Sequence, residues 1–286
     1  MSTTLYDRRC VLVVGRVPGS DLTEKTSEAL RIEGLRVQFK IEKTDKPEPN
    51  KAEIVVYNLK ASSRSDLEAD RGVRVILSAG YKDSTEQLFS GDSRFVNNKR
   101  EGVDWITKIE AHDSGRAFKF ARVSESFSAG ATAKDLVKKL VGALVKDPGN
   151  ALKKAEELTR TFANGHTLSG SAAQELTELL EPEGYTWSMQ DGRMEILKEG
   201  ETTDDEVLKV SPDTGLIGSP EMGAPEKKKG PAHLKCKLLL RSVKPGQRFQ
   251  LESAGRNGVY RARVVRMTGD THGGDWYTEV EATPVS

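Results

Sequence analysis

The 286-residue sequence predicts a mainly β protein with a helical insertion, and three observations lead to this fold class. Apolar and polar residues alternate with the period of a strand through much of residues 35–112 and 235–282. Asn-Gly and Asp-Gly pairs, which close tight hairpins, separate some of these segments. Helical spacing of Leu and Val is concentrated between residues 129 and 182. Many short strands joined by hairpins are typical of an antiparallel barrel or sandwich.

The first block of strands begins with residues 7–17 and is organised around Lys51–Leu59, KAEIVVYNL. The preceding strand contains Val37, Phe39 and Ile41 at alternate positions, and two prolines at 47 and 49 separate it from KAEIVVYNL. Within KAEIVVYNL both alternating sets are apolar, namely Ile54 with Val56 and Val55 with Tyr57. We therefore expect both faces of this strand to be covered, one by the barrel core and the other by a helix or a neighbouring subunit.

Shorter segments complete this block. A short helix carrying Leu67 is expected after Ser62 or Ser63. The strands expected after it are Val73–Ala79, Gln87–Ser90, Arg94–Asn97 and Trp105–His112.

A helical region follows from about residue 129. Thr132 and Asp135 have the spacing of a capping box, and the following residues to Leu144 have helical periodicity. A second helix is expected after Ser169 or Ser171, ending at Pro182 and Gly184. A compact hairpin, Tyr185–Met189 with Arg193–Lys198, then turns at Gln190-Asp191-Gly192.

The last third of the chain starts as loop and ends as strands. Residues 199–234 are rich in Pro, Gly and charge, and Lys227–Lys229 fits a solvated loop better than a nucleic-acid site. The strands expected after it are Lys235–Leu240, Arg248–Glu252, Gly258–Asp270 and Trp276–Ala282. In Gly258–Asp270 the apolar residues change face part-way along, which predicts a bulge or bend.

Composition limits the class of protein. The net charge is +1 with 30% charged residues, which excludes a strongly basic nucleic-acid binder in bulk. No apolar run reaches the roughly 18 residues of a membrane-spanning helix, and Cys10–Val14 is too short for a signal-peptide core. The sequence thus indicates a protein made and assembled in the cytoplasm. Cys10 and Cys236 lie in apolar surroundings and are expected to be buried free thiols.

The residues that carry chemistry in enzymes form no recognisable set here. His112, His166, His233 and His272 lie on separate elements without metal-ligand spacing, and His272 is interpreted as an exposed turn residue. Nucleotide-binding and nucleophile motifs are absent. Two carboxylate pairs, Glu110 with Asp113 and Asp204 with Asp205, have no feature of an acid/base pair, and Trp105, Trp187 and Trp276 are more typical of core or interface. We therefore predict no catalytic, cofactor or metal residues, no cofactor, and a protein that is not an enzyme.

Four segments, taken in order, resemble the baseplate hub proteins of tailed bacteriophages and related contractile injection systems. They are LRVQFKIEKTDKPEPNKAEIVVYNL, VILSAGYKDSTEQLFSGD, GYTWSMQDGRMEIL, and the pair SPDTGLIGSPE with GVYRARVVRMTGDTHGGDWYTEVEA. Each is a weak motif alone, and the four in series are far more specific. The chain departs from the family pattern at APEKKKGPAHLKC, which is longer and more charged than the family has.

The resemblance implies two tail-tube-like antiparallel β-barrel domains with a small accessory α/β region. Residues 1–118 would form the first barrel, 119–198 a helical accessory region with a small hairpin, 199–234 a loop-rich connector, and 235–286 strands completing the second barrel. Hub proteins form a homotrimeric ring that presents pseudo-sixfold symmetry to the tail tube above and threefold symmetry to the central spike below.

The resemblance also implies partners and a location. The expected partners are the tail tube or a tube-initiator protein, the central spike, the tape-measure protein, other baseplate proteins and, in transit through the ejection channel, genomic DNA. The expected location is the tail baseplate of the virion, after assembly in the host cytoplasm. Two alternatives stay open at this point, a tail-tip peptidoglycan hydrolase and a carbohydrate-binding tail module that uses Trp187 and Trp276.

Overall fold

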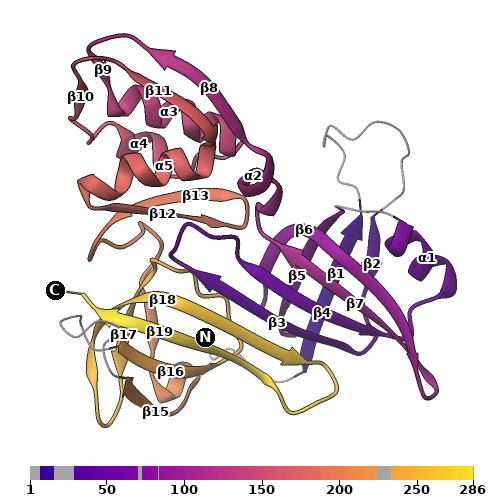
Figure 1. Ribbon diagram of the computed structural model, residues 1–286. Coiled ribbons are helices and arrows are strands. Elements are labelled where there is room, and N and C mark those ends of the chain that lie inside the picture. The colour runs from indigo at the N-terminus through magenta and orange to yellow at the C-terminus, as the bar shows by residue number, and fades with distance from the viewer. Residues whose placement is uncertain (1–6, 16–28, 70–72, 83, 224–232, 286) are drawn as a thin grey trace.

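One large antiparallel sheet runs through the molecule, with a separate helical region above it (Figure 1). The computed structural model describes residues 7–15, 29–69, 73–82, 84–223 and 233–285. The first half of the sheet comprises β1 (Arg8–Gly15), β2 (Leu30–Ile32), β3 (Val37–Thr44), β4 (Lys51–Tyr57), β5 (Arg74–Tyr81), β6 (Ser84–Glu101) and β7 (Asp104–His112), with helix α1 (Ala61–Ala69) beside it. The second half comprises β14 (Leu208–Val210), β15 (Leu216–Gly223), β16 (His233–Leu239), β17 (Arg248–Glu252), β18 (Asn257–Asp270) and β19 (Trp276–Pro284).

The two halves are continuous through the pairing of β3 with β18. The strand order is β15-β16-β19-β18-β3-β4-β7-β6-β5-β1-β2, and β17 joins β18 and carries β14 parallel to it. The ends of this path do not pair with each other among the described residues, so the predicted mainly β, antiparallel fold is confirmed, while strand pairing closes neither of the two expected barrels. Strand β3 joins the two halves, because it pairs with β4 along one edge and with β18 along the other.

The sheet buries one main core, which confirms the predicted strand faces. Phe39, Ile54 and Val56 point into this core with residues of both halves, including Leu77, Phe249 and Met267. The predicted change of face in the long C-terminal strand is also confirmed, because the register of β18 against β19 shifts between Ala262 and Val264. Cys10 and Cys236 are buried free thiols, as expected.

The helical region has a core of its own, on which the short sheets and helices pack. It contains α2 (Gly115–Phe120), β8 (Arg122–Phe127), β9 (Ala131–Thr132), α3 (Ala133–Leu144), α4 (Ala151–Ala155), β10 (Thr161–Phe162), β11 (His166–Ser171), α5 (Ala172–Leu180), β12 (Tyr185–Gln190) and β13 (Arg193–Lys198). The capping box of Thr132 and Asp135 is present at the start of α3. Phe118 stacks on Trp187 with ring centroids 5.1 Å apart in this second core.

Some elements differ from the sequence prediction. The segments Gln87–Ser90 and Arg94–Asn97 are parts of one long strand, β6, whose register shifts between Ser93 and Phe95. Helix α2 and the strands β14 and β15 have no clear signal in the sequence. The segment Lys227–Lys229 lies outside the described residues. None of the described helices has the length and apolar character needed to cross a membrane.

Candidate functional site

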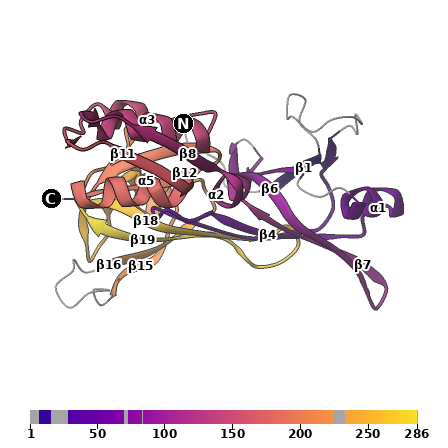
Figure 2. The same ribbon diagram turned by 45° about the horizontal axis from the view of Figure 1, so that its top comes forward.

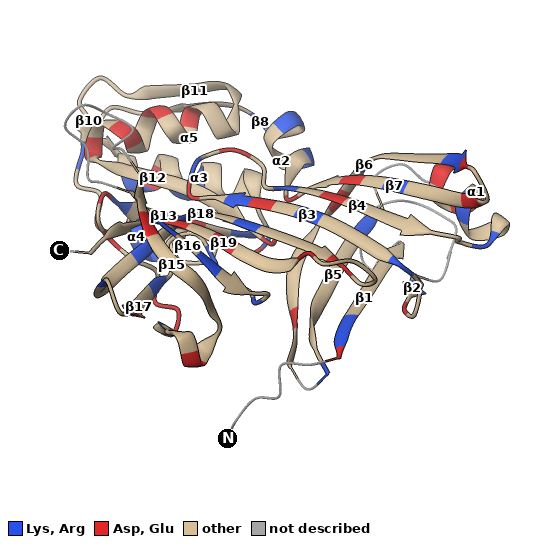
Figure 3. Cartoon of the chain, turned by 90° about the horizontal axis from the view of Figure 1, so that it is seen from below, with Lys and Arg blue, Asp and Glu red and all other residues tan. Residues whose placement is uncertain are grey.

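The outer face of the sheet carries rows of alternating charge that cross the seam between the two halves. Side chains alternate along a strand. Because Phe39 and Ile41 of β3 point into the core, Lys40 and Glu42 of the same strand point away from it. Strand register places Lys237, Glu279, Arg266, Glu42 and Lys51 side by side on β16, β19, β18, β3 and β4. Figure 3 shows basic and acidic positions interspersed along these strands. We call this surface the charged face.

Ion pairs on the charged face balance its charge. Arg266 lies 2.8 Å from Glu42 and 2.7 Å from Glu281, while Lys108 bridges Glu53 at 3.0 Å and Glu110 at 3.3 Å. Basic residues of the face include Lys40, Lys51, Lys108, Lys235, Lys237 and Arg266, and acidic residues include Glu42, Glu53, Glu110, Glu221, Glu279 and Glu281. Such exposed pairs contribute only about 0–1 kcal/mol each. Their main consequence is that opposite charges lie next to each other along this surface.

A shallow groove of about 540 Å³ runs along this face across the seam. Its lining includes Lys40, Glu42, Glu53 and Arg266, and His112 lies at one end of it. Burial, followed by the charges of Arg94 and Lys51, lowers the pKa of His112, so the imidazole is neutral at pH 7. No cluster of three or more His, Cys, Asp or Glu in the described parts of the chain is arranged to hold a metal ion. The groove is therefore lined by side chains of both charges.

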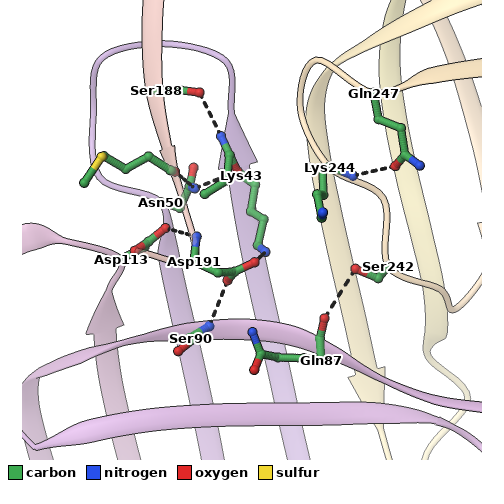
Figure 4. A network of polar contacts seen from close by, with 12 residues as sticks. Lys43, Asn50, Gln87, Ser90, Asp113, Ser188, Asp191, Ser242, Lys244 and Gln247 are labelled. Atoms are coloured by element: carbon green, nitrogen blue, oxygen red, sulfur yellow. Dashed lines mark hydrogen bonds and ion pairs between the residues drawn. The ribbon is translucent and has the colours of Figure 1, made fainter. Parts of the chain in front are cut away.

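A second site, the buried joint, fastens the helical region to the sheet (Figure 4). At the tip of the β12–β13 hairpin, the carboxylate of Asp191 contacts the ammonium of Lys43 at 2.6 Å and accepts a hydrogen bond of 2.9 Å from the Ser90 N–H. The N–H of Asp191 donates to the carboxylate of Asp113. Residue 191 therefore joins β3, β6 and the end of β7. The turn holds Asp191 at φ 56°, a left-handed conformation that Asp tolerates.

Amide side chains complete the joint. The side-chain NH2 of Asn50 donates to the Met189 carbonyl at 2.6 Å and to the Gln190 side-chain oxygen at 3.1 Å. The side-chain oxygen of Asn50 accepts from the Thr44 N–H at 2.9 Å. Gln190 donates in turn to the Thr44 carbonyl at 2.8 Å. Buried polar groups that satisfy one another in this way specify a single geometry. The joint thus fixes the helical region in one position over the seam.

The joint predicts a pH dependence through Asp113. Burial, and then the nearby charge of Asp191, raises the pKa of Asp113 to about 6. A carboxyl group whose pKa is raised by folding stabilises the fold when protonated, and this contribution is lost as pH rises through 6. When the pH falls from 7 to 4, the free energy of unfolding of the wild type should therefore rise by about 2 kcal/mol relative to that of the variant Asp113→Asn. Urea unfolding at both pH values measures the difference, and equal pH profiles for the two proteins would contradict the assignment.

The histidines and tryptophans lie on separate elements of the fold. The histidines are on β7, β11, β16 and the turn after β18, and His272 is exposed in that turn, as predicted. Trp187 and Trp276 are 1% and 3% exposed, so neither offers a platform to a sugar. Trp105 is 37% exposed, and the Arg64 guanidinium lies 4.0 Å from its ring centre.

The two carboxylate pairs considered from the sequence are not brought together as acid and base. Glu110 pairs with Lys108 on the charged face, whereas Asp113 is fully buried in the joint. Asp205 pairs with Lys244, and the neighbouring Asp204 is almost fully exposed. The sequence interpretation missed Lys43 and Asp191. A signal for Lys43 exists, because the alternation Val37, Phe39, Ile41 places residue 43 on the core face of its strand.

Solved structures with the same overall fold include two tail proteins. No family model and no curated protein matches the sequence. Among solved structures, the tail protein from Neisseria meningitidis MC58 is similar over 97% of both chains, with a TM-score of 0.62 and 11% identity. The 43 kDa tail protein of prophage MuSo2 from Shewanella oneidensis is similar over 98% of both chains, with a TM-score of 0.65 and 7% identity. The fold is that of phage tail proteins.

A third solved structure extends the likeness to secretion systems. The E. coli c3393 protein, a component of the type VI secretion system with structural similarity to the T4 tail proteins gp27 and gp5, matches 96% of this chain and 77% of its own. Its TM-score is 0.58 at 10% identity. The likeness to phage baseplate and injection-system proteins that four sequence segments indicated is therefore confirmed at the level of the fold.

Proposed function

We propose that this protein is a structural baseplate hub of a phage tail or a tail-derived injection machine. Three copies would form a ring that joins the six-fold tail tube to the three-fold central spike. The observation that carries this proposal is the fold, which matches phage tail proteins over nearly the whole length of both chains. The proposed architectural role is thus an analogy that rests on likeness of fold over whole chains.

The two halves of the sheet support the symmetry-matching role. Each half is a curved antiparallel unit, and the two are joined at the β3–β18 seam (Figure 1). We assign each half as one tube-like domain, so that a trimer presents six such units to the tube above. The strands β14 and β15 belong to the second unit in this assignment.

The charged face supports a channel-lining role in the same assembly. A lining that attracted phosphate strongly would retain DNA, because each neutralised phosphate adds to affinity. Alternating Lys and Glu on neighbouring strands lets each basic residue pair with a carboxylate of its own chain, as Arg266 and Lys108 do. DNA then passes along a hydrated surface without being bound.

This role is mechanical, and its partners are those of a baseplate. They are the tail tube or tube initiator, the spike, the tape-measure protein and other baseplate proteins, in a virion-located assembly built in the host cytoplasm. No enzymatic step is part of the proposal. Burial of Trp187 and Trp276 argues against the alternative carbohydrate-binding module.

Native mass spectrometry of the purified chain, alone and coexpressed with its tube and spike neighbours, tests the proposal. We expect a mass three times that of one chain, at least when the neighbours are present. A chain that stays monomeric at high concentration in both preparations would contradict the hub assignment. Bovine serum albumin, coexpressed and analysed in the same way, controls for non-specific association.

A further inference from the structure

Among the described strands, the charged face ends on each side in a stretch of strand edge that has no partner. At one end β15 pairs with β16 alone among the described strands. At the other end β6 pairs with β5 only through Ser84–Asp92, and its remaining part, Phe95–Glu101, pairs with β7 alone. This second part extends beyond the rest of the sheet as an arm (Figure 2). Unpaired edges present rows of N–H and C=O groups that are ready to pair with another strand.

The directions of these two edges fit each other. From β15 to β6, each strand is antiparallel to the next through β16, β19, β18, β3, β4 and β7. Strand β6 therefore runs opposite to β15. When β6 of one copy lies beside β15 of a second copy in the same orientation, the new pair is antiparallel and the alternation continues unbroken.

Exposed apolar side chains mark the same two edges. Phe95 is 53% exposed and lies opposite Glu110 on the charged face, while Ile217 is 37% exposed and lies opposite Lys237 on that face. Residues between Ile217 and Glu221 form a bulge containing Pro220, which cannot donate a hydrogen bond. The edge of β15 thus offers two short pairing runs, one on each side of the bulge, with Ile217 in the first.

We infer that Phe95–Glu101 of one copy pairs antiparallel with β15 of the next copy, and that three such contacts close a ring with the charged face inside. This inference rests on the proposed trimer and names the surfaces that form it. A second copy is the fitting occupant because one chain carries both complementary edges at opposite ends of one face. Such a head-to-tail contact uses each of these two edges once and leaves neither of them exposed when the ring closes.

Cysteine cross-linking tests this contact. The native Cys10 and Cys236 are buried, and burial raises the pKa of both thiols to about 12, so they stay unreactive. New cysteines go on the charged-face side of each edge, as Asn97→Cys or Lys99→Cys in β6 combined with Ile217→Cys or Glu221→Cys in β15. A short bismaleimide cross-linker can join the two thiols even where the register of β6 against β15 does not place them directly opposite each other. We expect at least one combination to convert most of the chain into a covalent trimer on a denaturing gel.

Controls separate this contact from other modes of association. Each single variant should give no cross-linked product alone, and mixing Asn97→Cys chains with Glu221→Cys chains before assembly should give a covalent dimer. Leu152→Cys, exposed on α4 away from the face, should not link to Asn97→Cys. A dimer formed by one single variant alone would show a two-fold contact and overturn the head-to-tail pairing.

Native mass measured on the same samples separates failure of the contact from failure of the trimer. A native trimer in which none of the combinations cross-links would overturn the β6–β15 contact and leave the hub proposal standing. A monomer in every sample, including those with tube and spike neighbours, would overturn both.

Discussion

The variant Asp191→Asn should lower the free energy of unfolding by about 3 kcal/mol, because it removes the charge partner of a buried lysine. Lys43 is 1% exposed, and its ammonium contacts Asp191 at 2.6 Å. Asparagine keeps the hairpin turn, since Asn-Gly suits the left-handed conformation of residue 191. Its carbonyl still accepts from the Ser90 N–H, but its NH2 group then faces the Lys43 ammonium, donor against donor.

A double-mutant cycle separates this charge effect from general damage to the joint. Combining Asp191→Asn with Lys43→Met replaces the pair by neutral groups, and should lose less stability than Asp191→Asn alone. Lys108→Met removes a lysine from an exposed pair and should cost less than about 1 kcal/mol. Urea unfolding followed by fluorescence reports the cycle, with Trp187 in the core of the helical region as one probe. A double variant as unstable as the sum of both single variants would contradict the proposed pairing.

Local pattern was enough to predict most strands and their buried faces. Alternation placed Phe39, Ile54 and Val56 in the core, and the capping box placed the start of α3 at Thr132. The change of apolar face in β18 predicted its bulge. These features depend on neighbours within a few residues, so the physics that decides them is contained in the local sequence.

Long-range pairing could not be predicted in the same way. Strand β3 pairs with β18, more than two hundred residues later, and this pairing joins the two halves into one sheet. The short edge strands β14 and β15 were also missed, because Pro220 and several glycines in that segment read as loop. The buried joint depends on residues of four elements meeting, which no local pattern encodes.

The outer face of KAEIVVYNL is partly covered within the single chain, and its cover by a neighbouring subunit stays a prediction. Val55 and Tyr57 are half-buried in the chain, and none of the described helices covers them. Their cover comes from long polar side chains on the same face, since Arg36 lies 4.7 Å from the Tyr57 ring centre and the Tyr57 hydroxyl bonds to Gln38 at 3.1 Å. Aliphatic stems of such residues shield apolar surface while their charged ends stay in water. An apolar strand face therefore fits within a charged surface.

The seam between the two halves should be the most sensitive part of the main core. Phe39 is buried where β3 meets β18, and its ring packs edge-on against Trp276 with centroids 5.6 Å apart. Phe39→Ala should therefore lower the free energy of unfolding by about 3–5 kcal/mol. Phe95→Ala, which truncates an exposed ring on β6, should change it by no more than about 0.5 kcal/mol. Urea unfolding followed by fluorescence measures both variants, and Trp276 reports directly on the seam.

The glycine that faces Phe39 allows a sharper test, because its effect should depend on the size of that residue. A Cβ on Gly269 would clash with Phe39 Cζ, so Gly269→Ala should cost about 1–3 kcal/mol in the wild type. In the Phe39→Ala background the added methyl group enters the vacated space, and alanine suits a strand better than glycine. Gly269→Ala should then cost clearly less than in the wild type, and the remaining cost comes from Trp276, whose Cε3 would lie 2.9 Å from the new Cβ. An equal cost in both backgrounds would show that the Phe39 ring is not what requires glycine at the seam.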